Sequence, residues 1–265
     1  MSWLLRIVFP PPPSIFIGAI SVISLVFTVH LSYSEIRGKH VPYSKFWNVN
    51  LQKKKKKEVT VYSRTGMVIS YTPAFLACIA SFAIFPHEGL RFMLVRSALA
   101  IHFFKRILEV LFIHKYSGRM VLDSVIQITL SYFIYATCMI YAQHLTQGIP
   151  EPAVNLKYVG VALFLVGIGG NFYHHYLLSR LRGEGDHGYK IPKGGLFNLV
   201  ICPHYLFEIL GFIGVCFISQ TLYSFSCTMG SILYLMGRSY ATRKWYFSKF
   251  ENFPKEVKCL IPFIF

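Results

Sequence analysis

The sequence predicts an all-α, polytopic membrane protein built as a bundle of about seven transmembrane helices. Of its 265 residues, 54% are hydrophobic and 14% are charged, whereas charged residues approach a quarter of a soluble domain. The apolar residues form long runs bounded by glycine, proline or charge, and a helix needs about 20 such residues to cross a bilayer. This composition excludes a disordered chain and a small disulfide-stabilised secreted module.

Seven apolar runs have the required length. The first follows the prolines that end at Pro13, and it lacks the basic flank and cleavage site of a signal peptide, so we expect it to be retained. The last two are parted only by Ser219 and Gln220. Because no linker or repeat separates the runs, we expect one membrane-embedded domain over residues 1–265. The expected spans are 14–33, 66–85, 92–113, 120–142, 157–178, 199–218 and 221–237.

Lysine and arginine are distributed unevenly between the two sides of this predicted bundle. One side holds 21 of the 27 basic residues, in segments 34–65, 114–119, 179–198 and 238–265. The opposite side holds three, which are Arg6, Arg91 and Lys157. Because basic residues favour the cytosolic side of a membrane protein, we expect a cytosolic carboxy terminus and an amino terminus across the membrane.

The formal charge of +16 does not indicate a nucleic-acid partner. The five consecutive lysines from Lys53 to Lys57 lie between the first two expected spans, where basic residues set membrane orientation. We therefore expect membrane lipids, and no nucleic acid, as partners.

The cysteines and histidines give no metal signature. The six cysteines show no C-x-x-C spacing and mostly lie within apolar runs, so we expect reduced, packed thiols. A zinc site would require His174, His175 and His204 to converge with a thiolate, and no spacing in the sequence is diagnostic of that arrangement. We therefore expect no metal.

The third expected span contains four ionisable residues on one helical face. His102, Lys105, Arg106 and Glu109 fall at positions i, i+3, i+4 and i+7. Charged groups in hydrocarbon cost about 2.5–3.5 kcal/mol each on insertion scales, so this face must turn away from lipid. It serves either as an internal salt bridge that locks neighbouring helices or as part of a functional site.

Two later segments also combine polar groups with membrane helices. In the fifth span, glycines 167, 169 and 170 precede Asn171, His175 and Arg182, which form a stripe toward the cytosolic edge. The glycines are a poor dinucleotide fingerprint, because no strand precedes them, and they better indicate close helix approach. Further along, Pro203 suits the first turn of a helix whose free N–H groups attract phosphate beside His204, with Glu208 one turn onward. A proline-kinked helix with a packed histidine is the alternative for this segment.

Basic residues of the tail complete the predicted site. Arg238, Arg243, Lys244 and Tyr246 follow the seventh span, where positive flanking charge is ordinary. We expect Arg182, Lys190, Arg238 and Arg243 to meet at one cytosolic mouth and to hold a dinucleotide phosphate there.

The carboxy-terminal half carries a pattern of residues that is typical of one family. Asn171, Arg182, the string Tyr189 to Phe197, Glu208, and the ending from Trp245 through Pro254 to Phe265 closely resemble the carboxy-terminal domain of steroid 5α-reductases. The resemblance covers residues 157–265. The third-span string from His102 to Arg106, with Glu109 and residues 112–117, is more similar to the very-long-chain enoyl-CoA reductase branch of the same superfamily.

This resemblance implies a seven-helix enzyme of the endoplasmic reticulum membrane that uses NADPH to saturate a carbon–carbon double bond conjugated to a carbonyl. Hydride goes to the β carbon, negative charge collects on the carbonyl oxygen, and a proton is added at the α carbon, so a polar group must lie near that oxygen. Lys190 stands where steroid reductases usually carry arginine. His204 stands where animal steroid reductases carry asparagine, and His175 where they carry aspartate. The cofactor residues implied by the resemblance are Arg106, Asn171, Arg182, Tyr189, Lys190, His204, Glu208, Arg238 and Tyr246.

The substrate end departs from the family pattern. Phe103 stands where steroid reductases carry the tyrosine that contacts the substrate ketone, and Phe103 cannot donate a hydrogen bond. The family's Gln-Glu pair appears here as Ser70 and Tyr71. Either the candidate catalytic residues Tyr71, His102 and Glu109 supply the missing donor, or the substrate is not a 3-oxo-steroid.

A lipophilic 3-oxo-4-ene steroid is the leading substrate by the carboxy-terminal resemblance. An enoyl-CoA is favoured by the third span, and a polyprenol is a further alternative. A membrane methyltransferase is a different enzymatic interpretation, although the string from Cys202 to Tyr205 matches the Arg-His-Pro motif of those enzymes only in part. A non-catalytic membrane scaffold is the remaining class, motivated by Phe103.

Overall fold

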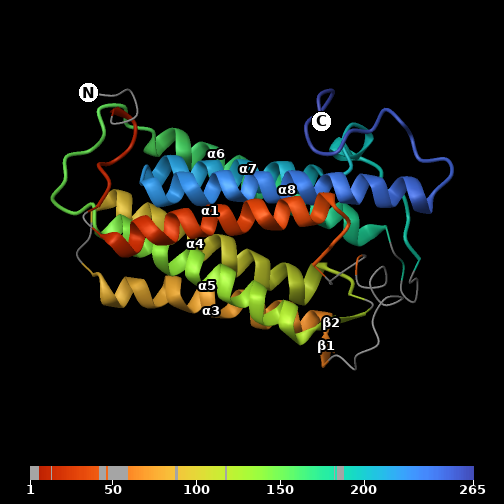
Figure 1. Cartoon of the computed structure of the whole chain (residues 1–265), viewed down its shortest axis with the longest axis horizontal. Helices are drawn as coiled ribbons and strands as arrows, with labels where there is room; N and C mark the ends of the chain where they lie inside the picture. Colours follow the sequence, from red (N-terminus) through yellow and green to blue (C-terminus); the bar gives the residue numbers. More distant parts are fainter. Residues whose placement is uncertain are drawn as a thin grey trace.

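The computed structural model describes residues 6–12, 14–41, 46, 59–86, 89–116, 118–181, 183 and 188–265. Over these residues the chain is all-α apart from one two-stranded sheet, which confirms the predicted fold class (Figure 1). The helices are α1 (Ile15–Ile36), α3 (Ser63–Ile84), α4 (Leu90–Leu108), α5 (Leu122–His144), α6 (Lys157–Arg180), α7 (Pro203–Ser219) and α8 (Leu222–Lys249). The strands are β1 (Thr60–Tyr62) and β2 (Arg119–Val121). A π-helical turn over Glu109–Ile113 extends α4, and a 3-10 turn over Gly195–Asn198 precedes α7.

Each of the seven expected spans corresponds to one helix, but the helices differ in length and in how apolar they are. Four helices are long and apolar enough to cross a membrane, namely α1, α3, α5 and α6. Helix α7 is apolar but has 17 residues. Helix α8 is longer than predicted and continues to Lys249, because the carboxy-terminal segment covers its polar end with an apolar cluster that includes Tyr246, Phe253 and Leu260.

The two short strands fix the level at which α3 and α5 begin. Strands β1 and β2 pair antiparallel, with Thr60 opposite Val121 and Tyr62 opposite Arg119. Helix α3 starts directly after β1 and helix α5 directly after β2. Figure 1 shows that the two helices start at the same end of the bundle and run in the same direction. This sheet lies at the end of the bundle that also holds the carboxy terminus, while α1 starts at the opposite end (Figure 1).

Helices α6 and α7 approach closely because glycines face the contact. A Cβ on Gly160 would lie 2.6 Å from the carbonyl oxygen of Gly214, and a Cβ on Gly167 would lie 2.8 Å from that of Phe207 and closer still to Gly211. No side chain fits at these positions. The glycines of the fifth span thus permit helix packing, as predicted.

Helix α1 is tied to α8 by a buried ion pair. Glu35 is 1% exposed and Arg238 is 2% exposed, and Arg238 Nη1 lies 2.5 Å from Glu35 Oε1. The second carboxylate oxygen of Glu35 lies 2.6 Å from His40 Nδ1. Nearby, Ser32 Oγ donates to the Leu233 carbonyl oxygen at 2.6 Å. Losing either partner of a buried pair leaves an uncompensated charge, so this contact fixes α1 beside α8.

A second polar cluster joins the loops at the amino-terminal end of the bundle. Arg91 Nη1 donates to the Ile218 carbonyl oxygen at 2.6 Å and to Gln220 Oε1 at 3.0 Å, and its other nitrogens reach Glu151. Gln220 ends α7 in the left-handed region, with φ of 51°.

All six cysteines are free and buried, which confirms the prediction of packed thiols.

The glycine contact predicts opposite effects for two substitutions on α6. Gly167→Ala places a methyl group against the backbone of α7 and should lower the free energy of unfolding by about 1–3 kcal/mol. A Cβ added to Gly169 would meet nothing within 4 Å, so Gly169→Ala should be neutral or up to about 1 kcal/mol stabilising. Thermal unfolding of both variants in the same detergent checks the prediction, and equal melting temperatures would contradict it.

Candidate functional site

One large cavity passes through the bundle. Its volume is about 760 Å³, and residues of α1, α3, α4, α5, α6, α7 and α8 line it. Toward the end of the bundle that holds the β1–β2 sheet, the lining is polar and includes Arg106, Lys115, His175, Lys190 and Glu208. Toward the middle and the opposite end it is mainly apolar and includes Ile20, Ile23, Phe27, Ile134 and Phe212. The cavity can therefore hold a charged group at one end and a lipophilic group at the other.

Glu109 is the centre of a buried charge network beside this cavity. The carboxylate is 1% exposed and accepts from two cations of its own helix, Lys105 Nζ at 2.9 Å and Arg106 Nη1 at 2.9 Å. His175 Nδ1 of α6 lies 3.1 Å from the same carboxylate. The predicted salt bridge of the third span thus exists, and it also joins α4 to α6.

Arg106 connects this network to the cavity. Its Nη2 donates to Tyr71 Oη at 2.7 Å, and its guanidinium lies 5.0 Å from the centre of the Tyr71 ring. Nη1 lies 3.2 Å from His175 Nδ1. Arg106 and Tyr71 both line the cavity. A guanidinium held at several points keeps one orientation, so it presents a fixed positive charge to a ligand.

Asn171 organises the other side of the network. Its side-chain oxygen accepts from Lys105 Nζ, and its amide nitrogen donates to the His204 carbonyl oxygen at 2.8 Å. Asn171 is 3% exposed and lies behind the residues that line the cavity. Its contacts hold Lys105 and the start of α7 in place. Pro203 occupies the first turn of α7, as predicted.

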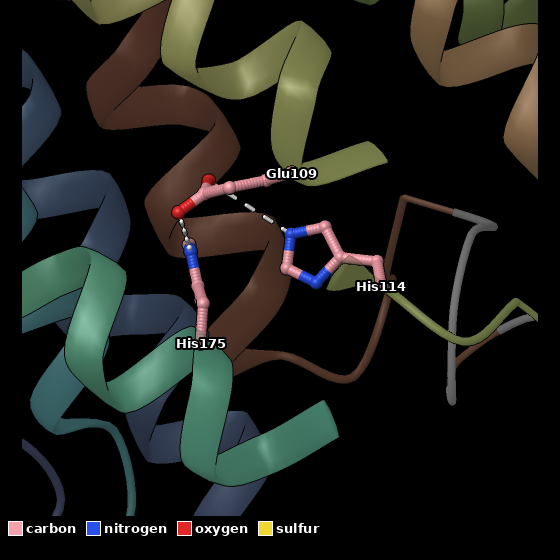
Figure 2. Close-up of side chains that lie close together, drawn as sticks. All are labelled: Glu109, His114 and His175. Atoms are coloured by element: carbon pink, nitrogen blue, oxygen red, sulfur yellow. Dashed lines mark hydrogen bonds and ion pairs between the residues drawn. The ribbon is translucent and has the colours of Figure 1, made fainter. Parts of the chain in front are cut away.

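Glu109, His114 and His175 lie close enough together to raise the question of a metal site (Figure 2). His175 and His114 approach the Glu109 carboxylate, but His114 Nε2 remains 4.0 Å from Oε2. Burial lowers the pKa of His114 to about 2, helped by the positive charge of Arg106. Lys105 and Arg106 already supply the positive charge that the carboxylate requires. A divalent cation would add a third positive centre beside them, so the cluster fits an ion-pair network better than a metal site.

His174 has different hydrogen-bond partners from the adjacent His175. Its Nδ1 lies 2.7 Å from the Gly170 carbonyl oxygen, and its Nε2 accepts from the Leu196 amide at 3.2 Å. It therefore supports the 3-10 turn before α7. The zinc arrangement of His174, His175 and His204 does not form.

Glu208 and His102 line the cavity without such anchoring. Within the described part of the chain, neither side chain has a hydrogen bond or a close ion pair, although Glu208 lies near enough to Lys105 and Arg106 to interact with their charges. His102 packs on the ring of Phe212, with ring centres 5.4 Å apart. Both side chains are placed to meet a ligand rather than to hold helices together.

The polar end of the cavity is lined by aromatic and basic groups from the loop before α7 and from α8. Tyr189, Lys190 and Tyr246 all lie on the cavity wall. The Tyr189 ring packs edge-on against Trp245, with centres 4.8 Å apart, and Tyr246 Oη lies 3.5 Å from the Lys190 carbonyl oxygen. These contacts bring together residues that the family resemblance assigns to the cofactor.

Two of the arginines predicted at the cytosolic mouth, Arg238 and Arg243, have other partners. Arg238 stacks on Phe46 at 4.2 Å, pairs with Glu35, and is not among the residues that line the cavity. Arg243 donates to the carbonyl oxygens of Val257 at 2.6 Å and Lys255 at 2.8 Å, and so fastens the carboxy-terminal segment. Arg182 and the lysine run from Lys53 to Lys57 lie outside the described residues.

Phe103 and Tyr71 define the region where a donor was expected. Phe103 is fully buried and packs edge-on against Tyr132, with ring centres 5.6 Å apart. The Tyr132 ring also packs at a tilt against Tyr71, with ring centres 5.1 Å apart. In this aromatic group it is Tyr71 of α3 whose hydroxyl contacts Arg106. Tyr71 is one of the candidate catalytic residues proposed from sequence.

Helix α5 contributes lining residues that sequence reasoning missed. Gln127, Ser131 and Tyr135 line the cavity at positions i, i+4 and i+8. This spacing of polar groups within an apolar span is a signal visible in the sequence, because such groups rarely face lipid. The family motifs lie in other helices and do not point to it.

Comparison with known proteins places the carboxy-terminal half of the chain in a known family. The family model described as 3-oxo-5-alpha-steroid 4-dehydrogenase matches residues 116–265. Over 107 residues the chain is 41% identical to a steroid 5-alpha-reductase of Gossypium hirsutum and 38% identical to 3-oxo-5-alpha-steroid 4-dehydrogenase 2 of Homo sapiens, covering 40% of this chain and 42% of each relative. The aligned part thus spans less than half the length of these relatives.

A longer alignment relates the chain to a protein that is named for a different activity. Over 172 residues it is 34% identical to a very-long-chain enoyl-CoA reductase of Dictyostelium discoideum, covering 62% of this chain and 55% of that relative. Both kinds of relative are named for oxidoreductases that act on carbon–carbon bonds. Because the family model covers more than half of the chain, the chain belongs to the 3-oxo-5-alpha-steroid 4-dehydrogenase family.

Proposed function

We propose that this protein is an NADPH-dependent reductase of the endoplasmic reticulum membrane, with its carboxy terminus in the cytosol. It saturates a carbon–carbon double bond conjugated to a carbonyl in a lipophilic substrate, with a 3-oxo-4-ene steroid as the leading candidate. The observation that carries this proposal is the large cavity, whose polar, basic end is continuous with an apolar half inside the bundle. A reaction between a charged dinucleotide and a lipophilic molecule requires such a space.

The residues at the polar end fit NADPH in kind. Lys115 and Lys190 bring positive charge for phosphates, and Tyr189 and Tyr246 bring aromatic faces for stacking. Glu208 can accept hydrogen bonds from an amide or a ribose hydroxyl. Arg182 remains a proposed phosphate ligand on the family resemblance alone. When bound, NADPH supplies a hydride for the β carbon of the substrate.

Arg106 and Tyr71 are the residues we assign to the substrate carbonyl. Negative charge develops on the carbonyl oxygen during reduction, and fixed donors lower the energy of that state. The Tyr71 oxygen accepts from Arg106 at 2.7 Å, which polarises its O–H group and makes it a stronger donor. Glu109 acts through Arg106 by holding it in place. His102 lines the same space and is the candidate to deliver a proton at the α carbon.

The lipophilic substrate reaches the cavity from the bilayer in this proposal. Ile23 and Phe27 of α1 are 59% and 41% exposed and also line the cavity. Leu130 and Ile134 of α5 are 53% and 37% exposed and line it as well. Side chains that face both lipid and cavity mark an apolar passage between α1 and α5.

An enoyl-CoA reductase is the second candidate function. It is favoured by the longer alignment, which extends beyond the carboxy-terminal region shared with steroid 5-alpha-reductases. Basic groups near the polar end of the cavity would then meet an acidic head group. A polyprenol reductase remains a third substrate alternative within the same chemistry.

Selective stabilisation by NADPH tests the cofactor assignment. A ligand that binds only the folded protein raises its stability by about 2.7 kcal/mol at 100 times its dissociation constant. We expect NADPH to raise the melting temperature of the purified protein in detergent more than NADH does, and S-adenosylmethionine to have no effect. The absence of a shift at saturating NADPH would favour a scaffold, and a shift with S-adenosylmethionine alone would favour a methyltransferase.

Two glutamates of the site should respond differently to neutralisation. Glu109→Gln leaves Lys105 and Arg106 without their anion and should lower the free energy of unfolding by about 3–5 kcal/mol. Glu208→Gln removes no ion pair found among the described residues, so it should retain stability while the shift produced by NADPH becomes smaller. Thermal unfolding with and without NADPH measures both effects. An unaltered NADPH shift in the Glu208 variant would remove that residue from the cofactor site.

Phe103→Tyr tests the substrate end. The substitution adds a hydroxyl at a position that lines the cavity, so we expect reduction of a 3-oxo-4-ene steroid with NADPH to increase by up to about tenfold, the value of one net hydrogen bond. The NADPH-induced shift serves as the control for folding. Steroid reduction that remains the same or falls in a folded variant would show that the missing hydroxyl does not limit activity.

A further inference from the structure

Three polar residues form a stripe along the cavity face of α5 that the proposed mechanism leaves unused. Gln127, Ser131 and Tyr135 follow one another at intervals of four residues, and all three line the cavity. Residues at this spacing lie on one side of a helix. Their neighbours Leu130 and Ile134 face lipid, so the stripe lies just inside the passage through which a lipophilic molecule enters.

The two ends of this stripe lack hydrogen-bond partners. No described residue hydrogen-bonds the Gln127 side-chain amide, and no described residue hydrogen-bonds Tyr135 Oη, which is covered by surrounding side chains. Ser131 between them is already satisfied, because its hydroxyl donates to the Gln127 carbonyl oxygen at 2.8 Å. A buried polar group without a partner costs about 1–3 kcal/mol, so the buried Tyr135 hydroxyl calls for a ligand. The Gln127 amide is half-buried on the cavity wall, where it is placed to meet a ligand as well.

The neighbours of Tyr135 offer it no good acceptor inside the protein. Its ring packs edge-on against Phe212, with ring centres 5.9 Å apart. The thiols of Cys216 and Cys227 are its electrostatic neighbours, but thiols are weak acceptors. By contrast, Tyr223 on the same cavity wall donates to the Ile134 carbonyl oxygen at 3.4 Å. A side-chain rotation of the kind common on ligand binding would bring the Tyr135 hydroxyl to the lumen.

The positions of the two residues give the length of the ligand. Gln127 is five residues into α5, or about 8 Å, and Tyr135 is thirteen residues in, or about 20 Å, at 1.5 Å per residue. Helix α3 starts at the same level, and Tyr71 is eight residues into it. Gln127 is therefore near the level of the reacting carbonyl, whereas Tyr135 lies well below it toward the middle of the bundle.

We infer that Gln127 and Tyr135 are specificity-determining residues that hydrogen-bond oxygen functions at the two ends of a rigid lipophilic substrate lying along α5. This inference rests on the proposed reductase function. Gln127 donates near the reacting carbonyl, and Tyr135 donates to an oxygen at the remote end. A fused-ring molecule oxygenated at both ends satisfies both groups, whereas a plain hydrocarbon chain leaves Tyr135 unpaired.

The test compares two 3-oxo-4-ene steroids that differ only in an oxygen at the end remote from the ketone. Binding to the NADPH-loaded protein is measured by ligand-induced thermal stabilisation and by titration, so the result does not depend on turnover. We expect the unaltered protein to bind the oxygenated steroid about three- to tenfold more tightly. Tyr135→Phe should abolish this preference without lowering the melting temperature of the ligand-free protein. Gln127→Met should weaken binding of both steroids by the same factor.

Thr137→Val is the matched control on the same helix. The Thr137 hydroxyl already donates to the Phe133 carbonyl oxygen at 2.8 Å and does not line the cavity, so its loss should leave both affinities unchanged. A preference that survives Tyr135→Phe, equal binding of the two steroids, or no binding of either would overturn the inference.

Turnover separates this inference from the proposed function. Reduction of both steroids with equal affinity would keep the reductase and reject the role of Tyr135. A Tyr135-dependent preference in binding without any reduction of the double bond would support the inference and reject the reductase.

Discussion

The Glu109 carboxylate is the constraint on which the arrangement of the polar half depends. It is buried, and it neutralises two adjacent cations on the same helical face. Without it, two positive charges would lie in a low-dielectric interior, which costs far more than an ion pair. The carboxylate also meets His175 of α6, so charge balance and helix packing are fixed by one group. The orientation of Arg106 toward Tyr71 and the cavity follows from this arrangement.

The close contact of α6 with α7 positions the wall of the cavity that these two helices form. Glycines let the two backbones meet, and this contact sets where Asn171 reaches the start of α7. Through Asn171, Lys105 of α4 is joined to the same point. Three helices are thus fastened at the polar end, whereas α1 is attached mainly to α8 through Glu35 and Arg238. The wall formed by α4, α6 and α7 and the proposed passage between α1 and α5 therefore lie on different sides of the cavity.

Much of the fold could be predicted from the sequence, because hydrophobic length and helical spacing are local properties. The seven helices, the shared face of the third span and the glycine contact all follow from such spacing. The end of α8 could not be predicted, since its polar last turns are covered by a segment that comes later in the chain. The partner of a charged residue is a tertiary property as well. Arg238 was expected at a phosphate, but the carboxylate that it meets lies 203 residues away in α1.

The candidate site was predictable where residues fall in a charged helical face or a family motif, and it was missed on α5, where Gln127, Ser131 and Tyr135 belong to neither. Tyr71, Arg106, Glu208 and His204 were selected from sequence and line one cavity. Tyr135 resembles an ordinary core residue in sequence, because a tyrosine ring packs well in an apolar span and only its oxygen reveals a missing partner.

The distribution of hydroxyl groups around the cavity gives a physical reading of the change at Phe103. The family resemblance predicts a tyrosine donor where Phe103 stands, yet the surrounding space is not purely apolar. Tyr71 on α3 is polarised by Arg106, and Tyr132 packs between Tyr71 and Phe103. A second group of polar residues lies on α5. Because α3 and α5 start together and run in parallel, donors on these helices sit at successive depths along one wall. A donor on α3 holds a carbonyl from another side of the cavity than a donor on α4 would, so a substrate held by Tyr71 would lie in the cavity at a different tilt.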